Sequence, residues 1–196
     1  MATTVFLVRH GRTALNASGL LRGRIDAPLD AVGLSEALRL GTLFASVALD
    51  KVVSSPLERS FETARAIAEP HGLTVTAEPA FADRDYGPWS GKPQAELEAR
   101  YGSVDGAPAA EVEARAAFER RVIAALDSLV GDSRNESVVV VGHDAVNKAL
   151  IQAYCDPRRD AGAEIPQPTG CWNRLVFHGR CVCEIVGAVP GDGARP

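Results

Sequence analysis

Val5-Phe6-Leu7-Val8-Arg9-His10-Gly11 is the stretch that decides the fold of this chain. Its apolar part is only a few residues long and rich in residues that favour strands, so it predicts a short buried β-strand. The strand ends in Arg9 and His10, and ligands of open α/β sheets bind at the carboxyl ends of the strands. An imidazole is a base or nucleophile near neutral pH, and a guanidinium is a forked donor for phosphate or carboxylate. Taken alone, the pair fits a ligand site and a purely structural strand end about equally well.

A second strand also ends in a histidine. Residues 137–141 are a nearly continuous valine run, which suits the centre of a parallel sheet, and Gly142-His143-Asp144 follows. A further short strand over residues 51–54 leads into a helix that carries Arg59 in its first turn. Because the carboxyl ends of parallel strands lie at one sheet edge, we expect these side chains to meet there. Two imidazoles, two guanidiniums and a helix N-terminus make a pocket for a dianionic phosphoryl group.

Strand and helix signals alternate along the chain, which indicates an α/β protein with a mainly parallel sheet. The helix after residues 51–54 is predicted to have Ser55 as its N-cap and Pro56 at its first position. A short turn at His178-Gly179-Arg180 predicts that the last two strands form an antiparallel hairpin. The other predicted elements are helices over residues 34–48, 118–129 and 146–154, strands over 73–77, 174–178 and 181–186, and loops over 11–33, 81–92, 102–109 and 156–170.

Length and composition are those of an ordinary globular protein. The chain has 196 residues, of which 46% are hydrophobic and 23% charged, so one domain with a substantial core is expected. We predict a single domain over residues 1–189 and a flexible C-terminal tail over 190–196. The net charge of −4 argues against a nucleic-acid-binding surface, and no apolar run is long enough to span a membrane. The N-terminus has no signal-peptide pattern, which favours a cytoplasmic location.

The cysteines all lie in the last quarter of the chain. Cys181 and Cys183 would place both thiols on one face of a strand, not in a metal-binding turn. No histidine or cysteine pair stands beside them at zinc spacing. We therefore expect no metal site, and we expect the cysteines to be reduced and mostly structural. They are Cys155, Cys171, Cys181 and Cys183.

Four sequence blocks together resemble the histidine phosphatase superfamily, the phosphoglycerate mutase-like enzymes. The blocks occur in the family's order between residue 5 and about residue 150. They are Leu7-Val8-Arg9-His10-Gly11-Arg12-Thr13-x-x-Asn16 with Gly23-x-x-Asp26-x-Pro28-Leu29 and Gly33, Ser54-Ser55-Pro56-Leu57-x-Arg59-x-x-x-Thr63-Ala64, Tyr86-Gly87-x-Trp89-x-Gly91-Lys92, and Val141-x-His143. The resemblance implies a three-layer α/β/α sandwich with a mainly parallel central sheet, in agreement with the alternation of elements.

The resemblance also implies a role for each residue of the pocket. His10, neutral at its reactive nitrogen, attacks phosphorus and becomes phosphohistidine. Arg9, Arg59 and His143 bind the equatorial oxygens, where charge is spread in the transition state. Asn16 helps to position the phosphate. No metal or other cofactor is required, because the cationic side chains supply the charge stabilisation.

The proton donor departs from the family's pattern. Close members carry a glutamate where this chain has Asp83, which keeps the acid but shortens its reach by one methylene. The competing interpretation of Asp83 is a loop residue that caps a neighbouring amide. Asp144 stands where a more distant branch has its proton donor, so it is the alternative acid, although a helix N-cap explains it too. Asp85 is expected to be structural.

Several other side chains are weaker candidates. Arg22, within Arg22-Gly23-Arg24, could form one wall of the pocket and select anionic substrates, or it could lie in a solvated loop. Arg158-Arg159 could reach over the pocket mouth. His71 and His178 fall outside the blocks and are expected at the surface.

The expected function is metal-independent hydrolysis of a small phosphate ester through phosphohistidine at His10. The nearest alternative is a cofactor-dependent phosphoglycerate mutase, but only about twenty residues separate Gly91 from the next predicted helix. That is too short for the insertion that closes over a mutase site, and the segment lacks a mutase's arginine cluster. A catalytically weak phosphate-binding or interaction module is the alternative from another class. The expected partner is a small phosphorylated substrate, without nucleic acid or membrane, and the resemblance allows a homodimer.

Overall fold

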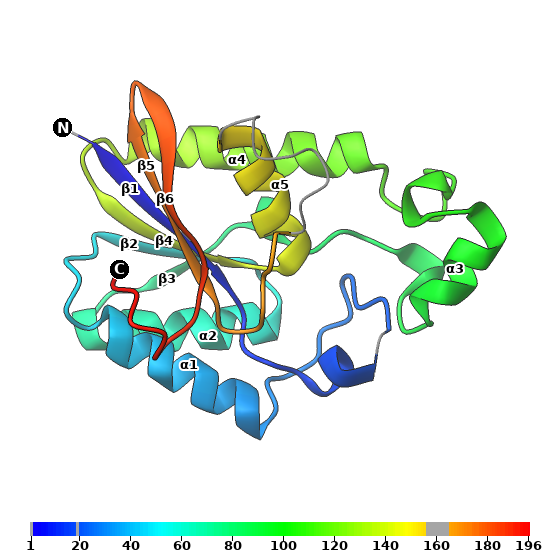
Figure 1. The fold of residues 1–196 in the computed structure, drawn as a ribbon, viewed down its shortest axis with the longest axis horizontal. Helices are drawn as coiled ribbons and strands as arrows, with labels where there is room; N and C mark the ends of the chain where they lie inside the picture. The colour runs from blue at the N-terminus through cyan, green and yellow to red at the C-terminus, as the bar shows by residue number, and fades with distance from the viewer. Residues whose placement is uncertain (1, 19, 156–164) are drawn as a thin grey trace.

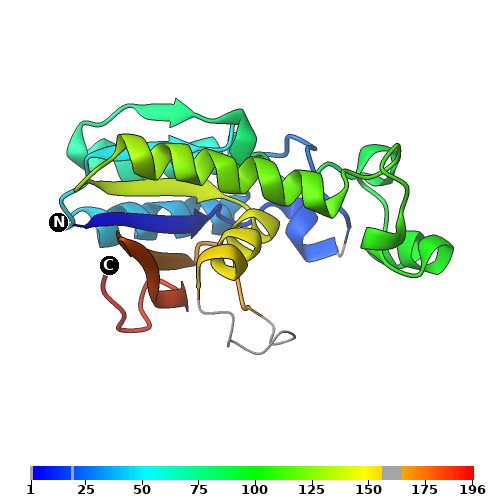
Figure 2. The ribbon, with the colours of Figure 1, turned by 90° about the horizontal axis from the view of Figure 1, so that it is seen from above.

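The sheet of this protein has six strands and lies between two layers of helices, as the computed structural model shows (Figures 1 and 2). The structure describes residues 2–18, 20–155 and 165–196. The strand order is β3-β2-β4-β1-β5-β6. The strands are β1 (Thr3–Arg9), β2 (Lys51–Ser54), β3 (Val75–Ala77), β4 (Ser137–Gly142), β5 (Trp172–His178) and β6 (Arg180–Ala188).

The parallel strands bring their ends to one edge of the sheet. β1 pairs with β4, which places Arg9 beside Gly142, and β4 pairs with β2, which places Val141 beside Ser54. The chain therefore leaves β1, β2 and β4 at the same edge. β5 runs antiparallel to β1, and β6 runs antiparallel to β5, which confirms the predicted hairpin.

Alternating side chains along β1 belong to two cores, one on each face of the sheet. The helices that cover these faces are α1 (Ala31–Phe44), α2 (Glu58–Ala68), α4 (Arg115–Asp132) and α5 (Asp144–Tyr154). Val5 and Leu7 pack on the side of α4 and α5. Phe6 and Val8 pack on the side of α1 and α2. An apolar strand that is covered on both faces is typical of a parallel sheet between helices, so the predicted three-layer sandwich is confirmed.

Two helix starts differ from the prediction. α1 begins at Ala31, earlier than predicted, because the Asp30 carboxylate accepts hydrogen bonds from two backbone N–H groups of the first turn. α2 begins at Glu58, so the prediction of Ser55 as its N-cap and Pro56 as its first residue is wrong. The Ser55 hydroxyl instead forms a hydrogen bond with a histidine ring of the site.

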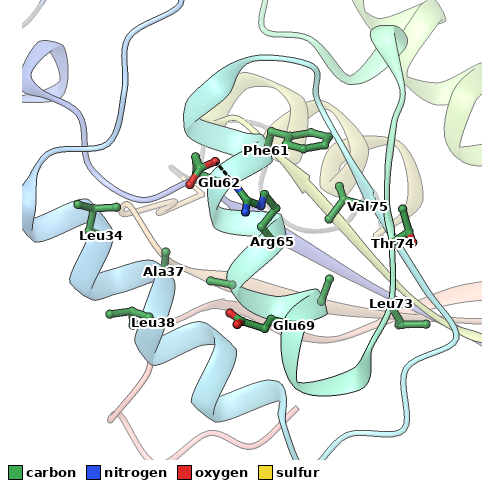
Figure 3. A pocket seen from close by; sticks show the side chains of 12 residues that line it. Leu34, Ala37, Leu38, Phe61, Glu62, Arg65, Glu69, Leu73, Thr74 and Val75 are labelled. Atoms are coloured by element: carbon green, nitrogen blue, oxygen red, sulfur yellow. Dashed lines mark hydrogen bonds and ion pairs between the residues drawn. The ribbon is translucent and has the colours of Figure 1, made fainter.

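The apolar stripe of α1 is wider than the face that the sheet covers. Leu34 and Leu38, which help to predict this helix, are 50% and 67% exposed. They line a surface groove of about 720 Å³ between α1, α2 and β3 (Figure 3). An exposed ion pair between Glu62 and Arg65 lies at the same groove. The periodicity therefore predicts the helix but overstates its buried face.

A small lobe extends beyond the sheet and contains α3 (Gln94–Tyr101), at the right of Figure 1. The sequence pattern predicts no helix here, and that expectation is wrong. α3 buries only Leu97, and no side chain caps its start, so it carries little of the periodicity that marks a helix. Leu97 packs with Leu21, Trp89 and Val112 in a core separate from the two that cover the sheet.

The prediction that all cysteines are reduced is also wrong. Cys155 and Cys183 form a disulfide bond, whereas Cys171 and Cys181 are free thiols. The bond joins the end of α5 to β6 across a sequence separation of 28, with the Cα atoms 5.5 Å apart. Spacing in the sequence does not reveal this pair, because the two residues meet only through the packing of α5 beside the hairpin.

Loss of this disulfide is expected to lower the free energy of unfolding by about 3 kcal/mol, because the bond closes a long loop and restricts the unfolded chain. Urea unfolding of the Cys155→Ser variant, followed by tryptophan fluorescence, measures the change. Cys181→Ser is the matched control, since it alters a free thiol two residues before Cys183. Equal stability of Cys155→Ser and oxidised wild type would show that the bond does not stabilise the fold.

The chain after β6 forms a turn. The Asp192 carboxylate accepts hydrogen bonds from the backbone N–H groups of Val189 and Ala194, and Ala194 packs against the core beside α1. The predicted flexibility of residues 190–196 and the domain boundary at 189 stay predictions. Within the ranges that the structure describes, no helix combines the length and the apolar character needed to cross a membrane.

Candidate active site

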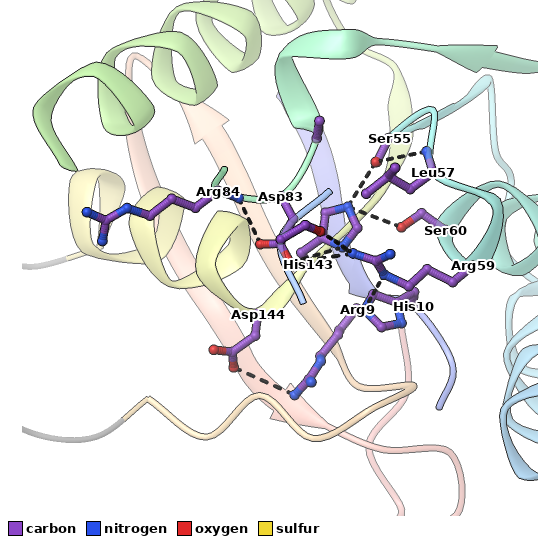
Figure 4. Close-up of polar contacts among 12 residues, drawn as sticks. Arg9, His10, Ser55, Leu57, Arg59, Ser60, Asp83, Arg84, His143 and Asp144 are labelled. Carbon is purple, nitrogen blue, oxygen red and sulfur yellow. Dashed lines mark hydrogen bonds and ion pairs between the residues drawn. The ribbon is translucent and has the colours of Figure 1, made fainter. Parts of the chain in front are cut away.

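The candidate active site forms where β1, β2 and β4 end (Figure 4). His10 follows β1 and His143 follows β4, and the centroids of their rings lie 5.2 Å apart. Arg59 comes from the first turn of α2, and Asp83 comes from the segment that leads from β3 towards the lobe. All four side chains are buried. The structure therefore brings together the residues for which the sequence predicts the main catalytic roles.

The His10 ring presents an unprotonated nitrogen to the site. Its Nδ1 lies 2.7 Å from the carbonyl oxygen of Gly11, and because a carbonyl only accepts, Nδ1 carries the proton. The other ring nitrogen, Nε2, therefore keeps its lone pair, and Arg59 Nε–H donates to it over 3.3 Å. Burial, and next the charges of Arg59 and Arg9, lower the pKa of His10 well below its usual value. The ring is neutral near pH 7, as a nucleophile must be.

The His143 ring has the opposite tautomer. Its Nδ1 lies 3.3 Å from Arg59 Nη2, which can only donate, so Nδ1 accepts. Its Nε2–H donates to Ser55 Oγ over 2.8 Å. Burial, and next the charge of Arg59, lower the pKa of His143 well below its usual value. A bound phosphate dianion would oppose the arginine charge and favour protonation at Nδ1, which would turn His143 into a donor.

Arg59 joins both histidines to the acid. Its guanidinium is oriented by two backbone carbonyls, with Nη1 donating to Ile25 over 2.7 Å and Nη2 donating to Gly23 over 3.0 Å. The same Nη2 lies 3.5 Å from Asp83 Oδ2. The side chain is 1% exposed, so the guanidinium is held in one orientation inside the protein. Its charge is therefore preorganised beside His10.

Asp83 makes contacts that fit both interpretations that the sequence left open for it. Its Oδ1 accepts a hydrogen bond from the Arg84 backbone N–H over 3.0 Å, as a capping residue would. Its Oδ2 faces the site, 3.5 Å from Arg59 Nη2 and 3.9 Å from His143 Nδ1. Burial raises the pKa of Asp83, although Arg59 opposes this effect. A raised pKa increases the protonated fraction, which a general acid needs.

Asp144 lies closer to solvent than Asp83. It is the first residue of α5, whose N-cap is His143, so the prediction of Asp144 as N-cap is wrong. Its carboxylate lies 3.7 Å from Arg9 Nη1 and 3.0 Å from Lys148 Nζ. The side chain is 29% exposed and is paired with two cationic side chains, whereas Asp83 is buried and faces the two histidines. The geometry therefore favours Asp83 as the proton donor.

Three buried nitrogens with predicted roles in phosphate binding have no hydrogen-bond partner among the residues that the structure describes. They are Arg9 Nε, Asn16 Nδ2 and Arg22 Nε. The Asn16 amide is oriented by its Oδ1, which accepts from the backbone N–H and the hydroxyl of Thr13, each over 2.8 Å. The charge of Arg22 contributes to the lowered pKa of both histidines. Because a buried donor without an acceptor is unfavourable, these groups indicate an anionic ligand.

The remaining weaker candidates that the structure describes lie in different surroundings from the main site residues. Arg24 forms an ion pair with Asp85 over 3.5 Å, and the Asp85 carboxylate also accepts a hydrogen bond from the Gly87 backbone N–H over 2.8 Å; the structural role of Asp85 stays a prediction. His178 is exposed, whereas His71 is half-buried and its ring lies 3.2 Å from a backbone carbonyl of α1. Arg158-Arg159 lie outside the described residues.

Two contributors to the site were missed by the sequence patterns as functional residues. Thr63 Oγ1 accepts a hydrogen bond from the Gly11 backbone N–H over 3.1 Å, which ties α2 to the turn after His10. The backbone carbonyl of Gln167 accepts a hydrogen bond from Arg9 Nη1. Thr63 stands in the second sequence block, so a signal existed, but a backbone carbonyl has no residue-type signature.

The melting temperature is expected to fall as the pH drops from about 7 to about 5. Burial lowers the pKa of His10 and His143 in the folded protein, so the unfolded chain takes up protons below its usual pKa of about 6.5 while the folded chain does not. This contribution to stability is therefore complete above that pH and decreases below it. The raised pKa of Asp83 acts in the opposite direction. The folded protein binds this proton at a pH above the usual pKa of 3.8, so the folded state gains stability relative to the unfolded chain as the pH falls towards that value.

Thermal melts between these pH values measure the effect. His143→Gln should reduce the slope of melting temperature against pH, whereas His71→Gln, outside the site, should leave it unchanged. Identical slopes for all three proteins would contradict the assignment to buried neutral histidines.

Comparisons with known proteins agree on one family. The sequence profile of the histidine phosphatase superfamily (branch 1) matches residues 5–186. An adenosylcobalamin/alpha-ribazole phosphatase of Escherichia coli (strain K12) is 28% identical over 179 residues, which cover 87% of this chain and 88% of the relative. An uncharacterized phosphatase, PhoE, of Bacillus subtilis (strain 168) is 32% identical over 149 residues, 76% of each chain. A solved phosphoglycerate mutase from Bacillus anthracis str. Sterne superposes with a TM-score of 0.85 over 95% of this chain and 93% of that chain; at 21% identity the likeness is one of fold.

Proposed function

Because this chain belongs to the histidine phosphatase superfamily and is a phosphomonoesterase of that type, we propose that it hydrolyses a small phosphate ester through phosphohistidine at His10. The reaction needs no metal in this proposal, since Arg9, Arg59 and Arg22 bring positive charge to the site. The observation that carries the proposal is the neutral His10 ring, whose free Nε2 lies beside the fixed guanidinium of Arg59.

The proposed chemistry has two displacements. In the first, His10 Nε2 attacks phosphorus, the bond from phosphorus to the ester oxygen breaks, and Asp83 gives its proton to the departing oxygen. Arg9, Arg59 and a protonated His143 stabilise the charge on the equatorial oxygens. In the second, the Asp83 carboxylate takes a proton from water, the hydroxide formed attacks phosphorus, and His10 leaves as a neutral ring.

Phosphate release in the presence of EDTA tests this proposal. The substrates to be tested are p-nitrophenyl phosphate and small alkyl phosphates. Alpha-ribazole phosphate is added because the Escherichia coli relative is named as an alpha-ribazole phosphatase. We expect EDTA-resistant turnover and an enzyme-bound phosphate that is lost in acid but retained in alkali, as a phosphorus–nitrogen bond requires. Exchange of phosphate between positions of phosphoglycerate with little release would support a mutase instead. Tight vanadate binding without turnover would support a binding module.

Asp83→Asn is expected to reduce kcat/KM about 10²- to 10³-fold for alkyl phosphates and much less for p-nitrophenyl phosphate, whose leaving group needs no proton. Asp144→Asn is the matched variant, because it changes a carboxylate of the same site that lies beside Arg9. It should affect both substrates to a similar extent. The reverse pattern, with Asp144→Asn selective for alkyl phosphates, would assign the acid to Asp144.

Phosphatases of this family act on small phosphorylated substrates. The absence of nucleic-acid and membrane partners, homodimer formation and a cytoplasmic location stay proposals for this chain. The disulfide makes the location testable, because cytosolic proteins rarely keep such bonds. Thiol labelling of Cys155 in fractionated cells should show a reduced residue if the protein resides in the cytosol.

A further inference from the structure

We propose that Gln167 is a positioning residue for Arg9, and that it acts through a buried network of amide side chains. The inference rests on the proposed phosphatase function and adds a residue that lies in none of the sequence blocks. The side chain of Gln167 is buried, and the residue precedes β5 in the segment that crosses the end of β1.

The segment from Gln167 to Cys171 braces the catalytic strand end. The Gln167 carbonyl accepts from Arg9 Nη1. In the backbone, Arg9 N–H donates to Cys171 over 2.9 Å, and Gly170 N–H donates to His10 over 3.2 Å. The position of the guanidinium therefore depends on where this segment is held.

Asn173 fixes the segment by an amide that can adopt only one orientation. Its Oδ1 accepts from the Gly187 backbone N–H over 2.8 Å, and its Nδ2 donates to the Leu7 carbonyl over 2.8 Å. The backbone thus dictates which end of the Asn173 amide is which. The Gln167 amide forms two hydrogen bonds with the Asn173 amide. Its Nε2 donates to Asn173 Oδ1 over 2.7 Å, and its Oε1 accepts from Asn173 Nδ2 over 3.0 Å.

The remaining hydrogen-bonding capacity of the Gln167 amide is also used. Its Nε2 donates to the Pro166 carbonyl over 3.0 Å, and its Oε1 accepts from Asn147 Nδ2 over 3.0 Å. Asn147 belongs to α5, and its backbone N–H donates to the His143 carbonyl over 2.9 Å. The network therefore connects the two catalytic strand ends through one buried side chain. With both of its amide hydrogens and its oxygen in hydrogen bonds, the Gln167 side chain is held in one arrangement.

Arg9 needs this support because its other anchor is exposed. Asp144 lies 3.7 Å from Arg9 Nη1 and is 29% exposed, so its hold on the guanidinium is weakened by solvent. Arg9 Nε has no partner within the described part of the chain and is free to donate to a phosphate oxygen. A displacement of about 1 Å at such a group can reduce the rate about 10²-fold.

The test is a double-mutant cycle between Gln167 and Arg9. Gln167→Met removes the amide at similar volume, and we expect kcat/KM for p-nitrophenyl phosphate to fall about 10- to 100-fold, with vanadate binding weakened similarly. In an Arg9→Ala background, the same substitution should change kcat/KM by less than about threefold, because its effect passes through Arg9. Multiplicative losses in the double variant would overturn the proposal.

Thr3→Val is the control for a purely structural effect. Thr3 is a buried, hydrogen-bonded residue at the opposite end of β1, so its loss destabilises the same strand without touching Arg9. It should lower the melting temperature and leave kcat/KM unchanged. An equal loss of kcat/KM in Thr3→Val would show that destabilised β1, not Arg9 position, is responsible.

Asn147→Leu gives the same test if Gln167→Met does not fold. It removes one hydrogen bond to Gln167 Oε1, together with an oxygen that has no partner in the described ranges. A loss of about 3- to 10-fold that disappears in the Arg9→Ala background is expected. If wild type shows no turnover, the phosphatase proposal fails, and the vanadate affinities of the same variants still decide whether Gln167 positions Arg9.

Discussion

His10→Ala is expected to reduce phosphate release about 10⁵-fold, to the background of the assay. The substitution removes the nitrogen that attacks phosphorus while leaving Arg59, His143 and Asp83 in place. Substrate binding should therefore survive better than turnover, because the arginines that hold the phosphate do not depend on the ring. Steady-state release of p-nitrophenol measures turnover, calorimetric titration with inorganic phosphate measures binding, and trapping of the enzyme-bound phosphate tests for the covalent intermediate.

His71→Ala is the matched control, since His71 lies outside the site and its ring lies 3.2 Å from the Phe44 backbone carbonyl of α1. It should retain wild-type turnover. Retention of both turnover and acid-labile phosphate in His10→Ala would place the nucleophile elsewhere and remove the basis of the mechanism.

Arg59→Ala is expected to reduce kcat/KM about 10³-fold and to lower the free energy of unfolding by about 3 kcal/mol. The loss of activity follows because the guanidinium lies beside His10 Nε2 and His143 Nδ1, at 3.3 Å from each. The loss of stability follows because the carbonyls of Ile25 and Gly23 lose their donor. Asp83 also becomes a buried carboxyl without its ion-pair partner.

Arg59→Lys should rescue little of either property, because one ammonium nitrogen cannot occupy the three positions from which Nε, Nη1 and Nη2 of the guanidinium donate. Arg65→Ala, an exposed arginine of the same helix that pairs with Glu62, is the control and should change neither. Urea unfolding and initial rates measure both quantities on the same preparations. Full activity of Arg59→Lys would mean that charge alone, without the forked geometry, is sufficient.

The central sheet and the edge where the candidate site lies could be predicted from the sequence, because a buried strand is recognised from a short run of neighbouring residues. The valine run before His143 and the apolar run before His10 each mark a buried strand, and parallel pairing then forces their ends together. Arg59 could be placed because a helix start follows the third strand end. These inferences need only short segments and one rule of topology.

What the sequence could not provide depends on contacts between distant segments. Ser55 and Asp144 have residue types that suit helix caps, but tertiary partners, a histidine ring and an arginine, determine their positions. The Cys155–Cys183 bond and the carbonyl of Gln167 arise only when the last strands pack beside α5 and β1. Neither has a local pattern to recognise.

The separate core of the lobe has a consequence for how such an enzyme can diversify. Leu97, Trp89 and Val112 pack together in the lobe, whereas the proposed nucleophile His10 follows the β1 strand end and the proposed phosphate-binding residues Arg9 and Arg59 come from β1 and α2. Substitutions in and around α3 can therefore change the surface of the lobe without altering the strand ends that carry His10 and His143. The lobe can thus vary in sequence while the strand ends keep one arrangement of side chains.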